Sequence, residues 1–251
     1  MESVLEFKHI SKYFPGVKAL DDICFKAYGG EVLAFLGENG AGKSTLLKVL
    51  NGDYKPDAGE YLLNGEQKHF RSPQEAIEEG ISVIYQERQI LLELSVAENI
   101  YLGRMPSNKL GVINTAKANQ MAQKIIDDFG LPIAPSTKVK DLSIAYQQMV
   151  EIMKAYSREN LKVICFDEPT ASLSDAEIDS LFAVIEKLKA QGKIVIYVSH
   201  RMDEIRRITD KVAIFKDGRY IDTVITAETD EKDMIKMMVG RDLGDIYAKL
   251  D

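Results

Sequence analysis

Short runs of apolar residues that end at polar positions recur along the chain and give the first indication of its fold. The clearest is Val32–Leu36, which has no polar position on either face and predicts a strand buried on both sides. Comparable runs occur at Ile81–Tyr85, Val163–Phe166 and Ile194–Val198. Because such strands are typical of a parallel sheet covered by helices, we expect an α/β protein with a mostly parallel sheet.

Other segments have the pattern of antiparallel strands. Val4–Ile10 and Ile23–Ala27 are strand-like and precede the first buried run. Asn64-Gly65 and Asp217-Gly218 are dipeptides typical of two-residue hairpin turns, the second within Lys211–Ile225. We therefore expect an antiparallel β flank beside the parallel core.

A mostly helical region interrupts this α/β pattern. It begins at Ser95-Val96-Ala97-Glu98, a capping box, and continues to about residue 157. Glycine and proline divide it into short pieces at Gly103, Pro106, Gly111, Pro132 and Pro135. We predict one domain over residues 1–251, with a nucleotide-binding core at 1–86 and 158–251 and an inserted helical lobe at about 87–157.

The candidate chemistry begins directly after the buried strand at Val32–Leu36. The segment Gly37-Glu38-Asn39-Gly40-Ala41-Gly42-Lys43-Ser44-Thr45 matches G-x-x-x-x-G-K-[ST] in full and leads into a predicted helix. Its glycines let backbone N–H groups face one anion at the positive end of that helix. Lys43 would reach the β- and γ-phosphates, and Ser44 would offer a hydroxyl to Mg²⁺. An accidental match occurs in roughly one chain of this length in a hundred, so we predict a nucleoside triphosphate site.

Polar side chains follow three of the buried strands. Asp167 and Glu168 end one of them, where Asp167 would hold Mg²⁺ and Glu168 would polarise the attacking water. Gln86 follows another strand and could orient Mg²⁺ or that water, and His200 follows a third and could donate to the γ-phosphate. Taken singly, each has a simpler explanation. Asp167 and Glu168 could be a solvated strand end, Gln86 an ordinary lone glutamine and His200 a structural histidine. The preceding phosphate loop favours the functional interpretation.

Two aromatic residues, Tyr13 and Phe14, lie in a predicted turn at Lys12–Val17. An aromatic residue beside a turn is usually part of the core. A purine ring also needs a stacking face, however, and either side chain could provide one.

The composition adds limits. The net charge of −7 argues against a broad surface for nucleic acid, although a local basic patch would survive this average. Cys24 and Cys165 lie in apolar runs, which favours buried thiols in a reducing cytosol over a disulfide. The apolar runs are too short to span a bilayer, and the N-terminus lacks the pattern of a signal peptide. We expect a cytosolic chain whose membrane contact, if any, goes through a partner.

Taken in order, these motifs resemble the nucleotide-binding subunit of ABC transporters, and the resemblance covers nearly the whole chain. The family's motifs match as follows: Walker A at Gly37–Ser44, the Q-loop at Gln86, Walker B at Val163–Asp167, the catalytic glutamate at Glu168, the D-loop at Ser172–Asp175, the switch histidine at His200 and the adenine-stacking aromatic at Phe14. The resemblance implies ATP and Mg²⁺ as ligands. It also implies an ABC ATPase fold, in which a helical lobe is inserted into a P-loop core, and a head-to-tail dimer with Mg-ATP at the interface.

Two phrases narrow the resemblance. Ser95–Arg104 and Met238–Leu243 are similar to segments in the first half of tandem ATPases that drive bacterial monosaccharide importers of the ribose, xylose and galactose type. This implies an ATP hydrolase at the cytoplasmic face of the cell membrane. Its partners would be a membrane permease, a second ABC module and, indirectly, a sugar-binding protein. Nucleic acid is not an expected partner.

One motif departs from the family. The signature LSGGQ is replaced by Leu142-Ser143-Ile144-Ala145-Tyr146, which keeps only the leucine and the serine at their positions. In the family this segment closes over the γ-phosphate held by the other subunit, so Ser143 is expected to bind in trans. Ile144 and Ala145 keep their N–H groups, but their Cβ atoms restrict close approach. The resemblance therefore implies an asymmetric pair with one good and one poor ATP site.

Rival functions remain at this stage. A soluble ABC ATPase of translation or DNA repair would share the core, but the acidic balance and the importer-like phrases weigh against it. A module in which ATP closes a dimer with little hydrolysis is compatible with the altered signature, whereas Glu168 weighs against it. A small-molecule kinase would need an acceptor pocket, which nothing in the sequence suggests.

Overall fold

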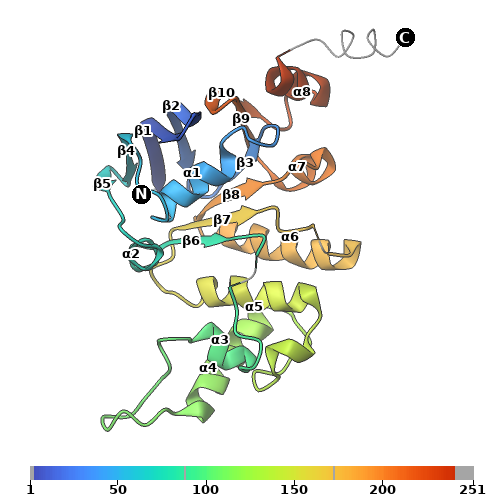
Figure 1. Cartoon of the computed structure of the whole chain (residues 1–251). Helices are drawn as coiled ribbons and strands as arrows, with labels where there is room; N and C mark the ends of the chain where they lie inside the picture. Colours follow the sequence, from blue (N-terminus) through green and yellow to red (C-terminus); the bar gives the residue numbers. More distant parts are fainter. Residues whose placement is uncertain (1–2, 88, 172, 241–251) are drawn as a thin grey trace. The chain divides into compact units, whose positions relative to one another are not determined.

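The computed structural model describes residues 3–87, 89–171 and 173–240 (Figure 1). Ser172 of the predicted D-loop, and the part of the importer-like phrase from Arg241 on, lie outside the described residues. The chain forms two compact units: Met1–Val83, Lys162–Glu168 and Ile185–Asp251 in the first, and Ile84–Leu161 and Pro169–Val184 in the second. The predicted boundaries of the helical lobe stay a prediction.

The first unit contains a six-stranded sheet in the order β10-β9-β3-β8-β7-β6. Its strands are β3 (Val32–Leu36), β6 (Ile81–Ile84), β7 (Val163–Asp167), β8 (Ile194–Val198), β9 (Lys211–Lys216) and β10 (Arg219–Ile225). Among the described pairings of this sheet, β7–β8, β8–β3 and β3–β9 are parallel, and the hairpin β9–β10 is antiparallel. Every residue of β3 and β8 is buried, which confirms the prediction of a mostly parallel core sheet.

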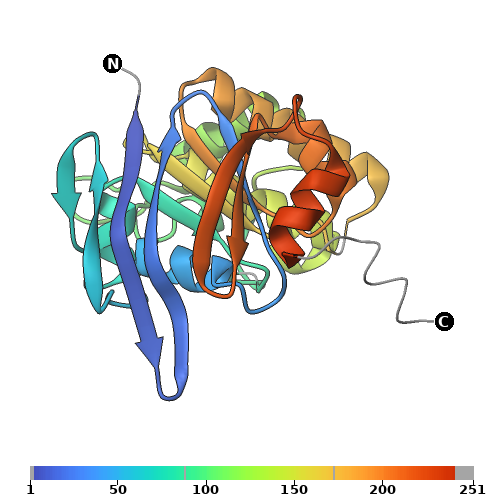
Figure 2. The ribbon, with the colours of Figure 1, turned by 90° about the horizontal axis from the view of Figure 1, so that it is seen from above.

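A second, antiparallel sheet in this unit has the order β2-β1-β4-β5, which confirms the predicted β flank. Its strands are β1 (Val4–Phe14), β2 (Val17–Tyr28), β4 (Ala58–Leu63) and β5 (Glu66–Lys68). Strands β1 and β2 form a long hairpin that extends past their neighbours (Figure 2). The prediction of a turn at Lys12–Val17 was too broad: Tyr13 and Phe14 belong to β1, because their cross-strand pairing with β2 continues up to the turn at Pro15-Gly16.

An aromatic cluster joins the two sheets. Phe25 of β2 stacks on Tyr220 of β10 at 5.5 Å between ring centroids and meets the edges of Phe35 and Phe215 at 5.5 Å and 5.7 Å. Phe7 of β1 also stacks on the ring of Phe25, with 4.7 Å between the ring centroids. Large rings that pack in offset and edge-to-face pairs contribute beyond their buried area, so this cluster stabilises the flank against the core.

The described part of the first unit also contains the helices α1 (Lys43–Leu50), α2 (Pro73–Glu78), α7 (Met202–Ile208) and α8 (Glu231–Val239). Ser72 caps α2 through the backbone N–H of Glu75, as its S-P-x-E sequence predicts. Both predicted hairpin turns form with positive φ at their two central residues, at Asn64-Gly65 and at Asp217-Gly218.

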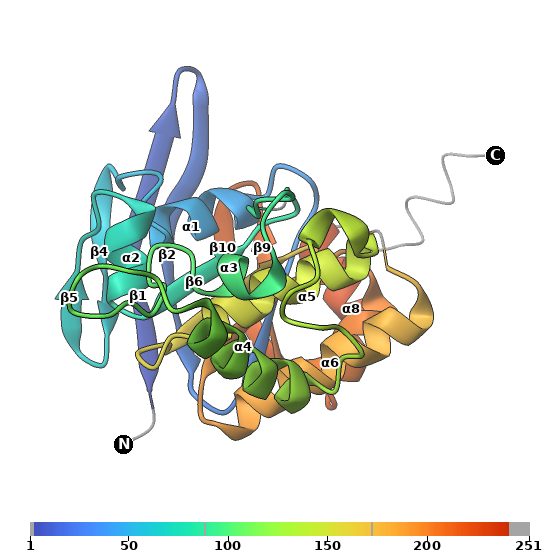
Figure 3. The ribbon, with the colours of Figure 1, turned by 90° about the horizontal axis from the view of Figure 1, so that it is seen from below.

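The second unit is helical. It contains α3 (Val96–Ile100), α4 (Thr115–Phe129), the 3₁₀ turn η1 (Val139–Asp141) and α5 (Ile144–Tyr156), and α3 lies against α4 and α5 (Figure 3). Ser95 and Glu98 form the predicted capping box of α3. The core consists of one face of each helix, including Ile100, Ile126 and Met153. Helix α6 (Asp175–Ala190) contributes residues to both units.

None of the helices within the described ranges is long and apolar enough to cross a membrane.

Candidate functional site

The phosphate loop connects β3 to α1, and three glycines shape it for different reasons. Gly37 is crowded, because an added Cβ would lie 2.6 Å from the carbonyl oxygen of Phe215. Gly40 has a φ of +85° with open space around it, so only its backbone conformation requires glycine. Gly42, the N-cap of α1, has a φ of +100°, and an added Cβ would lie 2.6 Å from the oxygen of Ala19. These constraints give the glycines of this motif a structural basis.

Lys43 is the first residue of α1, and its side chain folds back over the loop. Its Nζ donates to the carbonyl oxygens of Gly37 at 2.6 Å and Glu38 at 3.1 Å, so the ammonium group lies inside the curl of the backbone. Burial lowers the pKa of Lys43, and the nearby carboxylates of Glu168 and Asp167 oppose that shift. The loop therefore holds a positive charge at the place where the sequence predicts phosphates.

Ser44 and Asp167 meet across the carboxyl edge of the sheet. The hydroxyl of Ser44 donates to Oδ1 of Asp167 at 3.4 Å, although 123 residues separate them. Burial raises the pKa of Asp167, and the hydrogen bond from Ser44 partly opposes this. A hydroxyl and a carboxylate are hard oxygen donors of the kind that Mg²⁺ prefers, so the donor set fits this ion.

Glu168 follows Asp167 with an unusual backbone conformation. Its φ is +49°, in the left-handed region that non-glycine residues seldom adopt, and its N–H donates to the carbonyl oxygen of Val198 at 2.9 Å. Its Oε1 lies 3.3 Å from Nδ1 of His200, which follows β8. The two adjacent carboxylates thus have separate partners: Asp167 contacts Ser44 of the loop, and Glu168 contacts the histidine.

Glu204 is a buried carboxylate that the sequence analysis did not identify, and it stabilises the segment that carries His200. Glu204 of α7 is 2% exposed and accepts hydrogen bonds from Tyr197 at 2.8 Å and Ser199 at 3.0 Å. Its other oxygen lies 2.7 Å from Arg201. These donors lie on both sides of His200, so Glu204 positions the turn from β8 into α7. The i, i+3 spacing of Arg201 and Glu204 was the available sequence signal.

A cavity of about 490 Å³ adjoins these groups within the first unit. It is lined by residues of the loop and the strand ends and by apolar residues of β3, α7 and α8: Gly37, Glu38, Asn39, Glu168 and His200, then Leu36, Met202, Ile235 and Met238. The carboxylate and the histidine therefore face a space large enough for a reacting group.

Phe14 lies near the tip of the β1–β2 hairpin and is 37% exposed. Its ring meets the edge of Tyr54 at 5.3 Å between centroids, and Nζ of Lys12 lies 5.5 Å from its centre. Tyr13 is also exposed, and Nζ of Lys18 lies 5.7 Å from its ring. Both rings that the sequence proposed for base stacking are accessible, and Tyr54 is a partner of Phe14 that the sequence did not indicate.

Gln86 and Ser143 belong to the second unit. Gln86 is exposed in a bend after β6. Ser143 is the N-cap of α5, accepts from the N–H of Tyr146 at 3.3 Å, and is hydrogen-bonded to Glu177. Ile144, which replaces a signature glycine, is 46% exposed. Participation of Gln86 and Ser143 in a site with Lys43 stays a prediction.

Comparisons with known proteins identify the family and the fold of the chain. The model of a family described as ABC transporter matches residues 20–171, which include the phosphate loop, Asp167 and Glu168. The chain belongs to the ABC transporter family. Two solved ABC structures, each 27% identical, share its fold. A nucleotide-free ATP-binding cassette has a TM-score of 0.77 with 96% of each chain covered, and the ADP conformation of MJ1267, an ATP-binding cassette of an ABC transporter, has 0.78 with 99% covered.

Curated relatives confirm the narrower resemblance to sugar importers within the ABC family. The chain is 49% identical over 244 residues to the arabinose import ATP-binding protein AraG of Mannheimia succiniciproducens, and 50% identical over 245 residues to that of Escherichia coli O6:K15:H31. These matches cover 97% of this chain and 48% of each relative. The chain therefore spans about half the length of the curated relatives it matches.

Proposed function

We propose that this chain binds Mg-ATP and hydrolyses it to drive monosaccharide import through a separate membrane permease. The observation that carries the proposal is the pair of contacts at the sheet edge, Ser44 to Asp167 and Glu168 to His200, beside a phosphate loop that encloses Lys43. Membership of the ABC transporter family and the role for which the relatives are named, arabinose import, support it.

Each residue has a distinct role in the proposed reaction. The backbone from Gly37 to Thr45 would bind the phosphates, with Lys43 on the β- and γ-phosphates. Mg²⁺ would supply charge neutralisation at those phosphates, and Ser44, Asp167 and Gln86 would hold it. Glu168 would align and polarise the attacking water, and His200 would donate to the γ-phosphate.

We propose Phe14 as the adenine-stacking residue. A half-exposed ring at a hairpin tip, supported from the side by Tyr54, offers a flat face of the kind that bases use. Tyr13 is the alternative. A comparison of ATP binding by Phe14→Ala and Tyr13→Ala distinguishes the two residues.

The proposed working form is a head-to-tail pair of ABC modules with Mg-ATP between them. Ser143 and the first N–H groups of α5 would approach the γ-phosphate held by the partner module, since the start of a helix favours an anion. The helical lobe, about 87–157, would dock the permease at the cytoplasmic face of the membrane. A sugar-binding protein would act on the same permease, and nucleic acid has no part in this function.

The first test separates binding from hydrolysis. Glu168→Gln should keep ATP affinity and lose nearly all turnover, because the amide cannot polarise water, whereas Lys43→Ala should lose affinity itself. Turnover close to that of the parent chain in Glu168→Gln would remove Glu168 from this role.

The second test addresses the partner. ATP turnover by the chain alone is measured as its concentration is raised. Specific activity that rises with concentration means that two copies complete a site with the altered signature. Low, constant activity together with tight ATP binding means that another module must supply the signature. If activity stays low when that module is added, the chain is an ATP-gated dimerisation module instead.

A further inference from the structure

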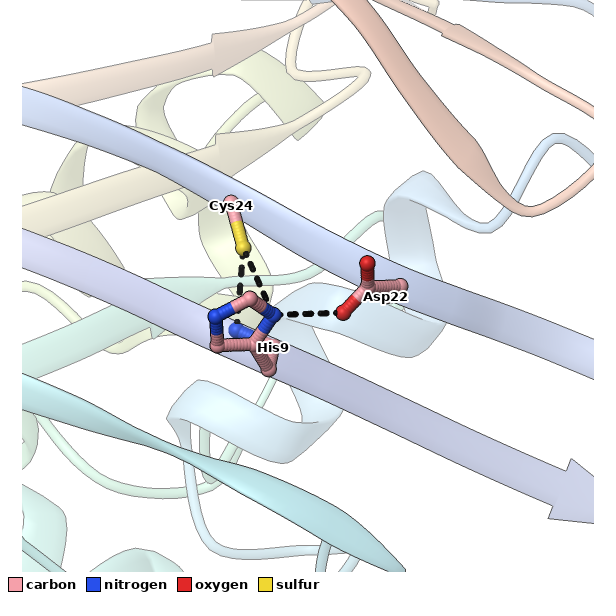
Figure 4. A group of neighbouring side chains, drawn as sticks. All are labelled: His9, Asp22 and Cys24. Carbon is pink, nitrogen blue, oxygen red and sulfur yellow. Dashed lines mark hydrogen bonds and ion pairs between the residues drawn. The ribbon is translucent and has the colours of Figure 1, made fainter.

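Three potential metal ligands converge on the β1–β2 hairpin, away from the phosphate loop. Figure 4 shows His9 of β1 facing Asp22 and Cys24 of β2. His9 and Cys24 lie at the register shift between Phe7 and Ile10, and Asp22 lies on β2 opposite the next shift, between Ile10 and Lys12. Such irregularities re-aim side chains, and these two direct an imidazole, a carboxylate and a thiol toward one point.

The distances among the three donor atoms are close to those of a bound metal ion. Nδ1 of His9 lies 2.7 Å from Oδ1 of Asp22 and 3.5 Å from Sγ of Cys24, and all three atoms lie within 4.8 Å of one another. Tetrahedral Zn²⁺ with ordinary bond lengths places nitrogen and sulfur about 3.6 Å apart and nitrogen and oxygen about 3.4 Å apart. The nitrogen–sulfur spacing already fits, and a small opening of the nitrogen–oxygen pair completes the geometry.

The number of protons that His9 can offer favours a bound metal cation at this cluster over a simple His9–Asp22 ion pair. One ring nitrogen, Nδ1 of His9, faces both the carboxylate and the sulfur, and it carries at most one proton. A single N–H directed at Asp22 leaves the sulfur beside the same nitrogen without a hydrogen bond from it. A metal ion at the common point instead accepts a lone pair from each of the three atoms.

The backbone around the three ligands is held in place. His9 and Asp22 both have left-handed conformations, with φ of +54° and +60°. The N–H of Asp22 donates to the hydroxyl of the buried Ser11 at 3.1 Å, and the N–H of His9 donates to Sγ of Cys24 at 3.1 Å. A backbone donor to a ligating sulfur is a common supporting contact in metal sites. The ligand positions thus exist before any ion arrives.

We propose that His9, Asp22 and Cys24 form a binding site for a divalent transition metal ion, zinc in particular. The side chains of His9 and Asp22 are 74% and 68% exposed, so an ion can enter and a water molecule can occupy the fourth position. Thiolate and imidazole donors select zinc over Mg²⁺, which prefers oxygen. This site is therefore distinct from the hard oxygen donors Ser44 and Asp167.

The test is a calorimetric titration of the nucleotide-free chain with Zn²⁺. The buffer is reducing, contains no chelator, and contains excess Mg²⁺ to occupy sites made of oxygen ligands. We expect one equivalent to bind. His9→Ala and Cys24→Ser should each weaken binding by about tenfold or more, and Asp22→Asn by a smaller factor. His69→Ala, which removes another exposed histidine, and Asp21→Asn, which removes the neighbouring carboxylate paired with Arg219, are the matched controls and should bind as the parent does.

A second measurement does not depend on any variant folding. Co²⁺ added to the parent chain should give a thiolate-to-cobalt charge-transfer band, which excess Zn²⁺ removes. Failure of the parent chain to bind Zn²⁺ saturably, or unchanged binding in a folded Cys24→Ser variant, would overturn the proposal. So would a cobalt spectrum without the charge-transfer band.

Discussion

The three glycines of the phosphate loop are required for two different physical reasons, crowding and backbone conformation, which their alanine variants distinguish. Gly40→Ala introduces only an unfavourable backbone conformation, which costs about 1–2 kcal/mol. Gly37→Ala introduces only crowding, because its Cβ would lie 2.6 Å from the Phe215 oxygen and 2.9 Å from Cβ of Ala41; overpacking of this kind costs about 1–3 kcal/mol.

Gly42→Ala combines both effects, since its φ is +100° and its Cβ would lie 2.6 Å from the oxygen of Ala19. The obstacle is backbone in β2, which cannot rotate away as a side chain does. We expect a loss of about 2–5 kcal/mol, the largest of the three.

The assay is urea unfolding followed by far-ultraviolet circular dichroism, in the absence of nucleotide so that binding does not alter the apparent stability. The midpoints should fall in the order Gly40→Ala, Gly37→Ala, Gly42→Ala, with the first closest to the parent chain. If Gly42→Ala is no less stable than Gly40→Ala, the inference that crowding against Ala19 requires glycine at position 42 is wrong.

Three further predictions concern the rest of the site. Glu204→Ala should destabilise the chain by about 2–4 kcal/mol in urea unfolding, because it removes a buried acceptor of three donors; Asp203→Ala, on the exposed side of the same helix, should change stability by less than about 0.5 kcal/mol. Phe14→Ala should weaken ATP binding by about 1–3 kcal/mol in a fluorescent-nucleotide titration with little loss of stability, and a larger effect in Tyr13→Ala would transfer the stacking role. Burial raises the pKa of Asp167, so this carboxyl keeps its proton to a higher pH than an ordinary aspartate; Mg²⁺-dependent ATP binding should fall on acidification through that raised pKa, and Asp167→Asn should lose this pH dependence.

Local sequence signals predicted much of this molecule. Buried runs such as Val32–Leu36 fixed the core strands, because a strand without a polar face has no stable place except inside a sheet. Turn pairs such as Asn64-Gly65 and capping boxes such as Ser95–Glu98 act over a few residues, so they predicted hairpins and helix starts correctly. The grouping of Ser44 with Asp167 followed from the rule that parallel strands end at a common edge.

Other features depend on contacts that no local pattern contains. The left-handed backbone at Glu168 is set together with a hydrogen bond to Val198, and the burial of Glu204 depends on donors that come together only when β8 and α7 are in place. The β1–β2 hairpin extends to Phe14 because its strands pair with each other to the end, which the apolar pattern did not show. Cys24 has the apolar neighbours of a core thiol, yet it lies partly exposed beside His9.

The backbone conformation of Glu168 has a mechanical consequence. Glu168 is the last residue of its segment in the first unit, and Pro169 begins the next segment of the second unit. A rotation about its φ, the N–Cα bond, would therefore turn the carboxylate and the outgoing chain together. A return of φ from +49° to the negative values of the extended region, which a residue before proline prefers, would relieve about 1–2 kcal/mol of backbone strain and break the alignment with His200 at the same time. At this position, rotation about φ couples the direction in which the chain leaves Glu168 to the aim of the proposed base.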